Sequence, residues 1–331
     1  MLYYILRRVL YMAIVLLIIT ILAFIVVQLP PGDYVTHYVL LEAQLGRSYS
    51  AAEIISLRKQ YGLDQPIYFQ YFVWLWKMLH GDMGLSFSYV FRPVSELLAE
   101  RLPFTVMLAL STFLFTYCVA IPIGIYSATH QYSIGDYIFT TLGFGGLATP
   151  NFLLALILMV LFYRYFGLSI GGLFSLEYLR ASWSVAKFID MLKHFPIPII
   201  VIGTAGTASL IRIMRGCLLD ELGKQYVITA RAKGLKERTL LFKYPVRMAV
   251  NPIISTIGWI LPGIISGETI TAIVLSLPTT GPLLFDALMA QDPYLAGSTL
   301  ALLAILTVIG TFISDLLLVL VDPRVRYEKL S

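Results

Sequence analysis

Six long apolar runs, almost free of charged residues, constrain the fold of this 331-residue chain more than any other feature. A helix that crosses a bilayer needs about 20 such residues in succession. The runs cover residues 9–32, 102–129, 137–163, 195–211, 248–267 with a tail to 277, and 294–320. The sequence therefore predicts an all-α integral membrane protein with six transmembrane helices.

The composition agrees with a membrane protein, since apolar residues make up 58% of the chain and charged residues 13%. The net charge of +5 is concentrated in one loop, residues 212–247, and in the C-terminal tail, as membrane topology requires, and need not indicate nucleic-acid binding. Arg7 and Arg8 precede the first run, as in a signal peptide, but the run is too long for one and no small-x-small cleavage site follows. We expect a retained first helix whose N-terminus lies in the cytoplasm.

The loop at residues 212–247 is strongly basic. Its nine basic residues are Arg212, Arg215, Lys224, Arg231, Lys233, Lys236, Arg238, Lys243 and Arg247, and only three acids oppose them. Lys and Arg in loops between spans resist translocation, which places this loop in the cytoplasm.

The same loop has the pattern of a helical hairpin. Between residues 218 and 233 only Gly223 interrupts a helix, and a second short helix is expected at residues 236–243, before Pro245. Gly234 stands where a left-handed helix C-cap favours a residue without Cβ. Ala230, Ala232 and Gly234 at the bend would let another surface approach the backbone. The alternative is a solvated loop whose charges only set topology.

The motif T-A-R-A-K-G-L at residues 229–235, preceded by Tyr226 and Val227, resembles the signature loop of ABC importer permeases in its dipeptide/oligopeptide form. The resemblance implies the type I ABC importer permease fold and a coupling helix that docks into a groove on a cytoplasmic ATPase. The implied coupling residues are Gln225, Tyr226, Thr229, Ala230, Arg231, Ala232, Lys233, Gly234, Leu235 and Lys236. The broad family pattern has an acidic residue and two alanines where this chain has Ile228, Thr229 and Ala230, and favours Asp where it has Gln225.

Three segments are expected from the arrangement of the runs: an N-terminal transmembrane helix (1–32), an external segment with short helices (33–101) and a permease core of five transmembrane helices (102–331). In the external segment, Ser50 and Glu53 form a capping-box pattern that begins a helix ending at Gly62. Pro66 is placed to begin an aromatic-rich helix, which can lie at the membrane boundary, pack against the spans, or both. A second amphipathic piece is expected at residues 175–194.

Two acids lie in or beside apolar runs and are candidates for structural or gating roles. Intramembrane acids are often functional. Glu268 stands one helical turn before the position where the resembled family has a Glu, and it either substitutes for that residue or packs against an Arg of a partner subunit. Asp315 precedes a tail, residues 321–327, that resembles the family's Asp-Pro-Arg-x-Arg ending, and we expect it to pair with an Arg near the cytoplasmic face.

The motifs of a catalytic chain are absent from the sequence. It has no G-x-x-x-x-G-K-[ST] phosphate loop, no H-E-x-x-H and no C-x-x-C, and its four His are dispersed. We therefore expect no enzyme activity and no cofactor bound by this chain, with ATP and Mg²⁺ on partner ATPases.

The resemblance implies a permease subunit of a binding-protein-dependent ABC importer in the cell membrane, multi-pass, with both termini cytoplasmic. Its implied partners are a second homologous permease, two ABC ATPase subunits, an external solute-binding protein and membrane lipid. Short peptides are the expected substrate; oligosaccharides remain an alternative, and nickel is a weaker one because the chain has no His cluster. An ion-coupled secondary transporter is the alternative from another class, but it needs ionisable residues near the midplane and spans two to four carry none.

Overall fold

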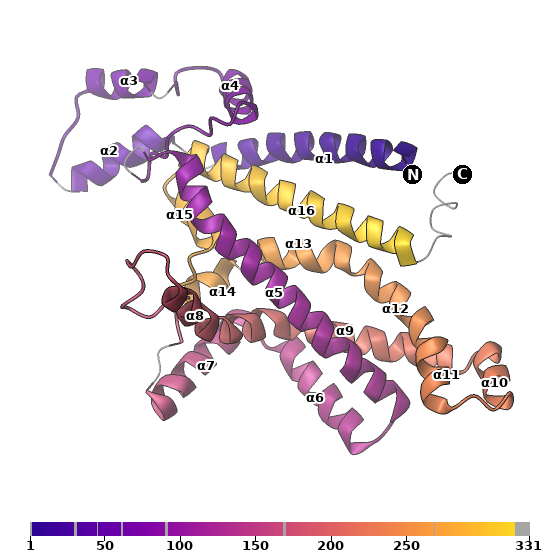
Figure 1. Cartoon of the computed structure of the whole chain (residues 1–331). Coiled ribbons are helices and arrows are strands. Elements are labelled where there is room, and N and C mark those ends of the chain that lie inside the picture. Colours follow the sequence, from indigo (N-terminus) through magenta and orange to yellow (C-terminus); the bar gives the residue numbers. More distant parts are fainter. Residues whose placement is uncertain are drawn as a thin grey trace. The chain divides into compact units, whose positions relative to one another are not determined.

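The computed structural model describes residues 2–29, 32–44, 46–60, 62–89, 92–167, 170–267 and 269–321. Most of these residues lie in helices, which confirms the predicted all-α fold (Figure 1). Two compact units form: one combines Met1–Thr105 with Thr279–Val308, and the other combines Val106–Pro278 with Ile309–Ser331. The three segments expected from the sequence divide the chain by membrane topology, whereas these units divide it by packing.

The first unit joins the N-terminal part of the chain to two later helices. It contains α1 (Leu2–Gln28), α2 (Tyr34–Gln44), α3 (Ala51–Gln60), α4 (Ile67–Leu79), the start of α5 (Val94–Thr129), α15 (Thr280–Met289) and the first part of α16 (Pro293–Val321). Leu97 and Leu98 at the start of α5 are almost fully buried in one apolar cluster with Leu295 of α16.

Two short helices of the first unit, α3 and α4, begin where the sequence predicts. The amide of Ser50 donates to Glu53 Oε2 at 2.7 Å, and the amide of Glu53 donates to Ser50 Oγ at 3.3 Å. This reciprocal pair is the predicted capping box, and it satisfies two amides that have no partner inside α3. Pro66 is the N-cap of α4, where its missing N–H costs nothing.

The aromatic helix α4 has two faces. Tyr71 and Trp74 are buried in a cluster with Phe24 of α1 and Ala301 of α16. Tyr68, Phe72 and Trp76 are exposed and belong to the other face, where aromatic rings suit a membrane–water boundary. The packing interpretation is confirmed for the buried face, and the membrane-boundary interpretation stays a prediction for the exposed face.

A buried carboxylate fixes the loop before α5 to the start of α16. Asp292 is fully buried, and its Oδ2 accepts hydrogen bonds from Ser86 Oγ at 2.7 Å and from the amide of Phe87 at 2.8 Å. The same oxygen accepts from the amide and hydroxyl of Ser88, while Oδ1 accepts from the amide of Leu295. Several donors thus compensate the charge, as a buried carboxylate requires.

The second unit is built around α9 (Pro196–Leu222). It also contains the rest of α5, α6 (Ile134–Ala148), α7 (Asn151–Phe166), α8 (Val185–His194), α10 (Gln225–Ala232), α11 (Glu237–Lys243), α12 (Pro245–Ser255), α13 (Ile257–Gly267), α14 (Thr269–Val274) and the end of α16. Met214 and Leu218 of α9 are fully buried against Ala120 of α5 and Ile253 of α12. These buried residues carry α9 to Leu222, beyond the predicted end of the fourth run at residue 211, so the first turns of the basic loop are helical.

The third apolar run, residues 137–163, is not one continuous helix. α6 and α7 are bent by 105° at the break between Ala148 and Asn151. Pro150 has no N–H to donate and disfavours the helical conformation at the residue before it, and Thr149 indeed has φ −94° and ψ 119°. The break at Pro150 therefore divides the third run into two helices, a feature that the expectation of one continuous helix did not include.

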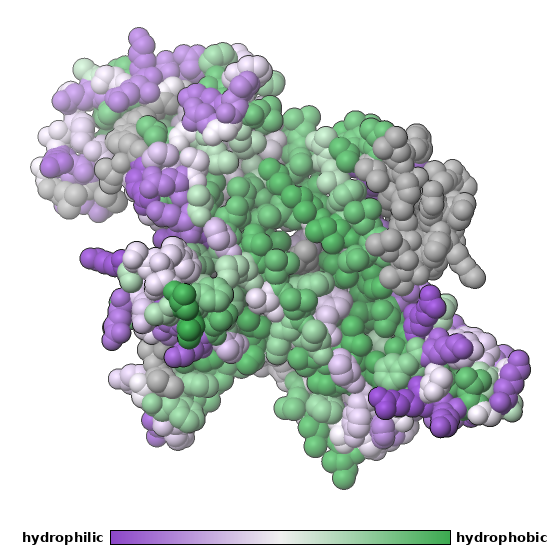
Figure 2. Space-filling view, in the orientation of Figure 1, coloured by the Kyte–Doolittle hydropathy of each residue, from purple (hydrophilic) through white to green (hydrophobic). Residues whose placement is uncertain are grey.

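Five helical segments among the described residues are long and apolar enough to cross a membrane. They are Leu6–Gln28, Val94–Thr129, Val185–Leu222, Glu237–Ile265 and Pro293–Leu317. The bent pair α6–α7 makes a sixth when it counts as one span, in agreement with the predicted number. Figure 2 shows hydrophobic residues over the long helices and hydrophilic residues gathered over α10 and α11.

Candidate coupling site

The predicted helix–Gly–helix hairpin is present as α10 and α11. The bend between them contains Gly234, which has φ +77°, the left-handed conformation that its predicted C-cap position requires. A Cβ added at Gly234 would meet no atom of the described chain within 4 Å. The space beside the bend is therefore open to another surface.

A small apolar core makes the hairpin a folded element. Val227 of α10 and Leu240 of α11 are fully buried, and Ala230 is 7% exposed. Leu235 and Tyr244 pack against them from the bend and from the end of α11. Burying a Val or Leu side chain contributes about 1.5–3 kcal/mol. This order argues against the alternative of a solvated loop that only sets topology.

An exposed ion pair joins the end of α10 to the start of α11 across the bend. Arg231 donates from Nε to Glu237 Oε1 at 2.6 Å and from Nη2 to Oε2 at 3.1 Å. Both side chains are half or more exposed, so the pair contributes little to stability. Its bidentate geometry instead restricts the angle between α10 and α11.

The hairpin is also tied to the end of α9. Glu221, near that end, accepts hydrogen bonds from Lys224 Nζ at 2.5 Å and from the Tyr226 hydroxyl of α10. Burial, together with the hydrogen bond to Glu221, raises the pKa of Tyr226 to about 12. Tyr226 therefore remains protonated and able to donate to Glu221 at physiological pH.

The predicted coupling residues form an exposed surface. Only Ala230 is buried among the ten, and Leu235 is intermediate; the exposed ones are Gln225, Tyr226, Thr229, Arg231, Ala232, Lys233, Gly234 and Lys236. Two apolar side chains that the prediction omitted, Ile228 and Phe242, are 47% and 55% exposed. A basic surface with apolar side chains and an open glycine bend has the chemistry of a protein docking site.

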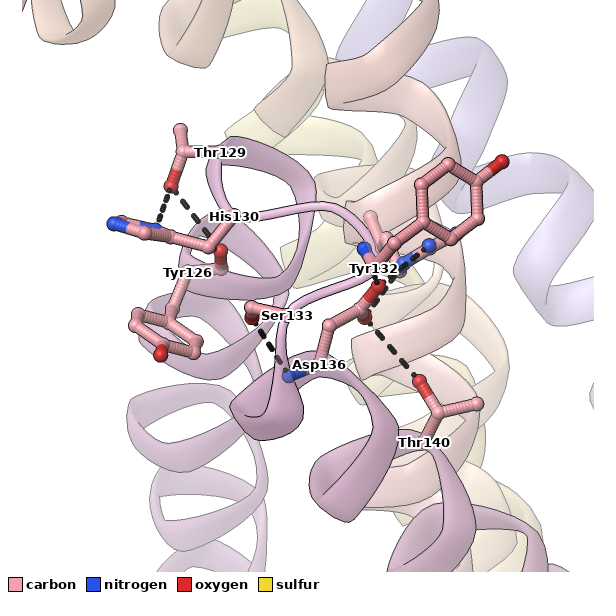
Figure 3. Close-up of polar contacts among 8 residues, drawn as sticks. Tyr126, Thr129, His130, Tyr132, Ser133, Asp136 and Thr140 are labelled. Carbon is pink, nitrogen blue, oxygen red and sulfur yellow. Dashed lines mark hydrogen bonds and ion pairs between the residues drawn. The ribbon is translucent and has the colours of Figure 1, made fainter.

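An ion pair between a buried carboxylate and a partly exposed arginine joins α6 to α9, and sequence reasoning missed it. Asp136, in the first turn of α6, accepts from Arg215 Nε at 3.0 Å and from Nη2 at 2.8 Å. Figure 3 shows the Asp136 side chain leaving the first turn of α6, with Ser133 at the start of the helix and Thr140 one turn further along. The one available signal was the Ser-x-x-Asp pattern, since Ser133 Oγ accepts from the amide of Asp136 at 3.2 Å.

The two other candidate acids, Glu268 and Asp315, keep the status of predictions. Glu268 lies outside the described residues, as does most of the C-terminal tail. Asp315 lies on α16 and is partly buried, and its pairing with an arginine stays a prediction. Among the described residues no three His, Cys, Asp or Glu side chains are grouped so that they could bind a metal ion.

Comparison with known proteins extends over the whole chain. Residues 120–327 match the family model "Binding-protein-dependent transport system inner membrane component", and residues 1–109 match "Binding-prot-dependent transport system membrane comp, N-term". The oligopeptide transport system permease protein AppB of Bacillus subtilis (strain 168) is 37% identical over 325 residues, which cover 98% of this chain and 99% of that protein.

Two further relatives match at similar length. The oligopeptide transport system permease protein OppB of Haemophilus influenzae is 30% identical, with 99% of this chain and 100% of that protein covered. The dipeptide transport system permease protein DppB of Escherichia coli (strain K12) is 31% identical, with the same coverage. With the helical fold and the hairpin that carries the signature motif, these matches show that the chain belongs to the family of binding-protein-dependent transport system inner membrane components.

Proposed function

We propose that this chain is a permease subunit of an ATP-driven importer of short peptides. The observation that carries the proposal is the ordered, exposed hairpin α10–α11, in a chain whose full-length relatives are named oligopeptide and dipeptide permeases. The hairpin presents Gln225, Lys236 and the exposed residues between them to a cytoplasmic ATPase.

The motor and the substrate receptor are separate chains in this proposal. The sequence contains no phosphate loop, so ATP and Mg²⁺ bind to two partner ATPase subunits. A second homologous permease completes the translocation path, and an external solute-binding protein delivers the substrate, as the family description "binding-protein-dependent" supports.

Charge and contacts support an orientation with both termini and the hairpin in the cytoplasm. The basic loop 212–247 favours the cytoplasmic side. The pair of Asp136 and Arg215 brings the turn between α5 and α6 close to the C-terminal half of α9, so both belong to the same side. An even number of spans then returns the C-terminus to the side of the N-terminus.

The mechanism proposed for the hairpin is mechanical. ATP binding closes the two ATPase subunits and displaces the docked hairpin. The apolar core around Val227 holds α10 to α11, and the hydrogen bonds of Glu221 attach the start of the hairpin to α9, so the displacement reaches the spans. The spans then shift between inward-facing and outward-facing states, as in other transporters driven by rigid-body motion.

Uptake by purified components tests the function and the substrate class together. The chain is reconstituted in liposomes with its partner permease, ATPases and binding protein, and labelled short peptides are compared with labelled oligosaccharides. We expect ATP-dependent uptake of peptides that requires the binding protein. Uptake of oligosaccharides alone would contradict the peptide assignment, and uptake driven by an ion gradient without ATP would contradict the importer class.

A further inference from the structure

We propose that Asp136 and Arg215 are positioning residues that clamp the turn between α5 and α6 to α9 and so transmit hairpin displacement to these helices. The inference rests on the proposed function and deepens it. It assigns a role to a contact outside the hairpin, between elements that the sequence motif does not include.

Two hydrogen bonds between Arg215 and Asp136 restrict both the distance and the orientation of the two side chains. The side chain of Asp136 is 4% exposed and that of Arg215 is 26% exposed. Two parallel hydrogen bonds, at 3.0 and 2.8 Å, fix the orientation of the guanidinium as well as its distance. The amide of Tyr132 donates to Asp136 Oδ2 at 3.0 Å, so the same carboxylate also holds the backbone of the turn.

Burial of the Asp136 carboxylate carries a desolvation cost, which reduces what the pair contributes to stability. Replacing a buried ion pair by apolar residues of similar volume is often neutral or stabilising, whereas removing one partner leaves an uncompensated charge. A buried pair therefore suits a role in fixing one arrangement of helices. Here it fixes the N-terminal turn of α6 against α9.

The position of Arg215 on α9 links the clamp to the hairpin. α9 continues without a break from Arg215 to Glu221, which binds Lys224 and Tyr226 at the start of the hairpin. Contacts therefore run from α10 through Glu221 and α9 to Arg215, and from there through Asp136 to α6.

The backbone of α5 approaches α9 at the neighbouring turn. A Cβ added at Gly124 would lie 2.6 Å from Cβ of Met214 and 3.1 Å from the carbonyl oxygen of Ile211. This close approach leaves α9 little room to slide along α5. With Asp136 holding the turn that joins α5 to α6, displacement of α9 moves both helices.

Spatial connection alone does not demonstrate transmission, so the test measures coupling between the two residues. The reconstituted complex is compared with Asp136→Asn, Arg215→Gln, the double variant and Arg215→Lys. Arg92→Gln is the matched control, since it removes an exposed cation that pairs with Glu96 and Glu100 in the first unit. The readouts are peptide molecules taken up per ATP hydrolysed, the yield of assembled complex and its thermal unfolding temperature.

We expect each single neutral variant to lower the peptide-to-ATP ratio by about 5- to 150-fold, the usual range of coupling between sites. The double variant leaves no buried charge unpaired, so its yield and unfolding temperature should recover toward wild type while the ratio stays low. Arg215→Lys keeps the charge but loses the bidentate geometry, so its ratio should be intermediate. Arg92→Gln should keep the wild-type ratio.

The proposed role would be contradicted if the assembled double variant took up as many peptide molecules per ATP as the wild type. It would also be contradicted if the single variants lost only yield or thermal stability. Failure of the proposed function is a different result. It would appear as an absence of ATP-dependent peptide uptake in the wild-type complex, before any variant is compared.

Discussion

Gly234 has a left-handed backbone conformation and also lies on the proposed docking surface. Its φ of +77° disfavours a β-branched side chain, but a side chain there would meet no other part of the described chain. Gly234→Val should therefore leave membrane insertion intact and uncouple ATP hydrolysis from uptake. Peptide uptake and ATP hydrolysis are measured on the same reconstituted sample.

Gly81 offers a control for the backbone strain. It follows the C-cap of α4 with φ +81°, and a Cβ there would also meet no atom within 4 Å. Gly81→Val imposes a similar strain of about 1–3 kcal/mol outside the hairpin. If both variants lose uptake equally, or if Gly234→Val transports like wild type, the hairpin has no role in coupling.

Asp292 is the residue on which the loop at residues 86–88 depends. Asp292→Ala removes the acceptor for Ser86 Oγ and for the amides of Phe87 and Leu295. Each buried donor left without a partner costs about 1–3 kcal/mol. We expect a clearly lower thermal unfolding temperature in detergent, whereas Asp64→Ala, at an exposed site, should unfold near the wild-type temperature.

The sequence could not show which charged residues of the site pair with one another. Arg215 was assigned to the basic loop because its charge is visible, but its partner Asp136 lies 79 positions away on another helix. No local pattern specifies which acid folds beside a given arginine. Gly234 was predictable because a helix C-cap is a local property, decided by a few neighbouring residues.

Helices were predictable where local signals decide them. The capping box at Ser50 and Glu53, the start of α4 after Pro66 and the hairpin helices all follow from short-range chemistry. The continuity of α9 from its span through to Leu222 and the 105° bend between α6 and α7 were not predicted. The continuity of α9 depends on tertiary packing, through the burial of Leu218, whereas the bend begins at Pro150 and its angle is specified by no local pattern.

The capping box makes α3 sensitive to acid. Hydrogen bonds from the backbone and side chain of Ser50 lower the pKa of Glu53 below its ordinary value of 4.5. Because the folded-state pKa is lower than the unfolded one, this contribution is complete above about pH 4.5 and is lost as the pH falls through the folded-state pKa. Amide exchange of Ala51–Gln60, corrected for intrinsic rates, should therefore lose protection on acidification.

Glu53→Gln is the control for that effect. Gln can still occupy the capping-box position but does not titrate. Protection of α3 in this variant should change much less between neutral and acidic pH. An equal loss of protection in both proteins would show that Glu53 is not the titrating group.

On the scale of the whole molecule, the sequence predicted the number of spans but not the packing units. Residues 279–308 pack with the first 105 residues, although four apolar runs lie between α1 and residue 279. Hydropathy measures the solvent that a segment prefers, and it contains no information about which segments become neighbours.

Labelling of single cysteines tests the proposed orientation. Cys118 and Cys217 are replaced by Ala, and a cysteine is introduced at Lys233 in the hairpin bend or at Asp64 in the external segment. A membrane-impermeant maleimide added to intact cells should label Asp64→Cys and should label Lys233→Cys only after the membrane is opened. Labelling of Lys233→Cys in intact cells would place the hairpin outside.

The central claim is that the α10–α11 hairpin receives force from a separate ATPase, and peptide uptake measured with and without the ATPase subunits tests it most directly. The liposomes contain the two permeases and a saturating amount of binding protein in both cases. Uptake should require the ATPase subunits and hydrolysable ATP, and Gly234→Val should abolish uptake while hydrolysis continues. Peptide accumulation at the wild-type rate without the ATPase subunits would contradict the account.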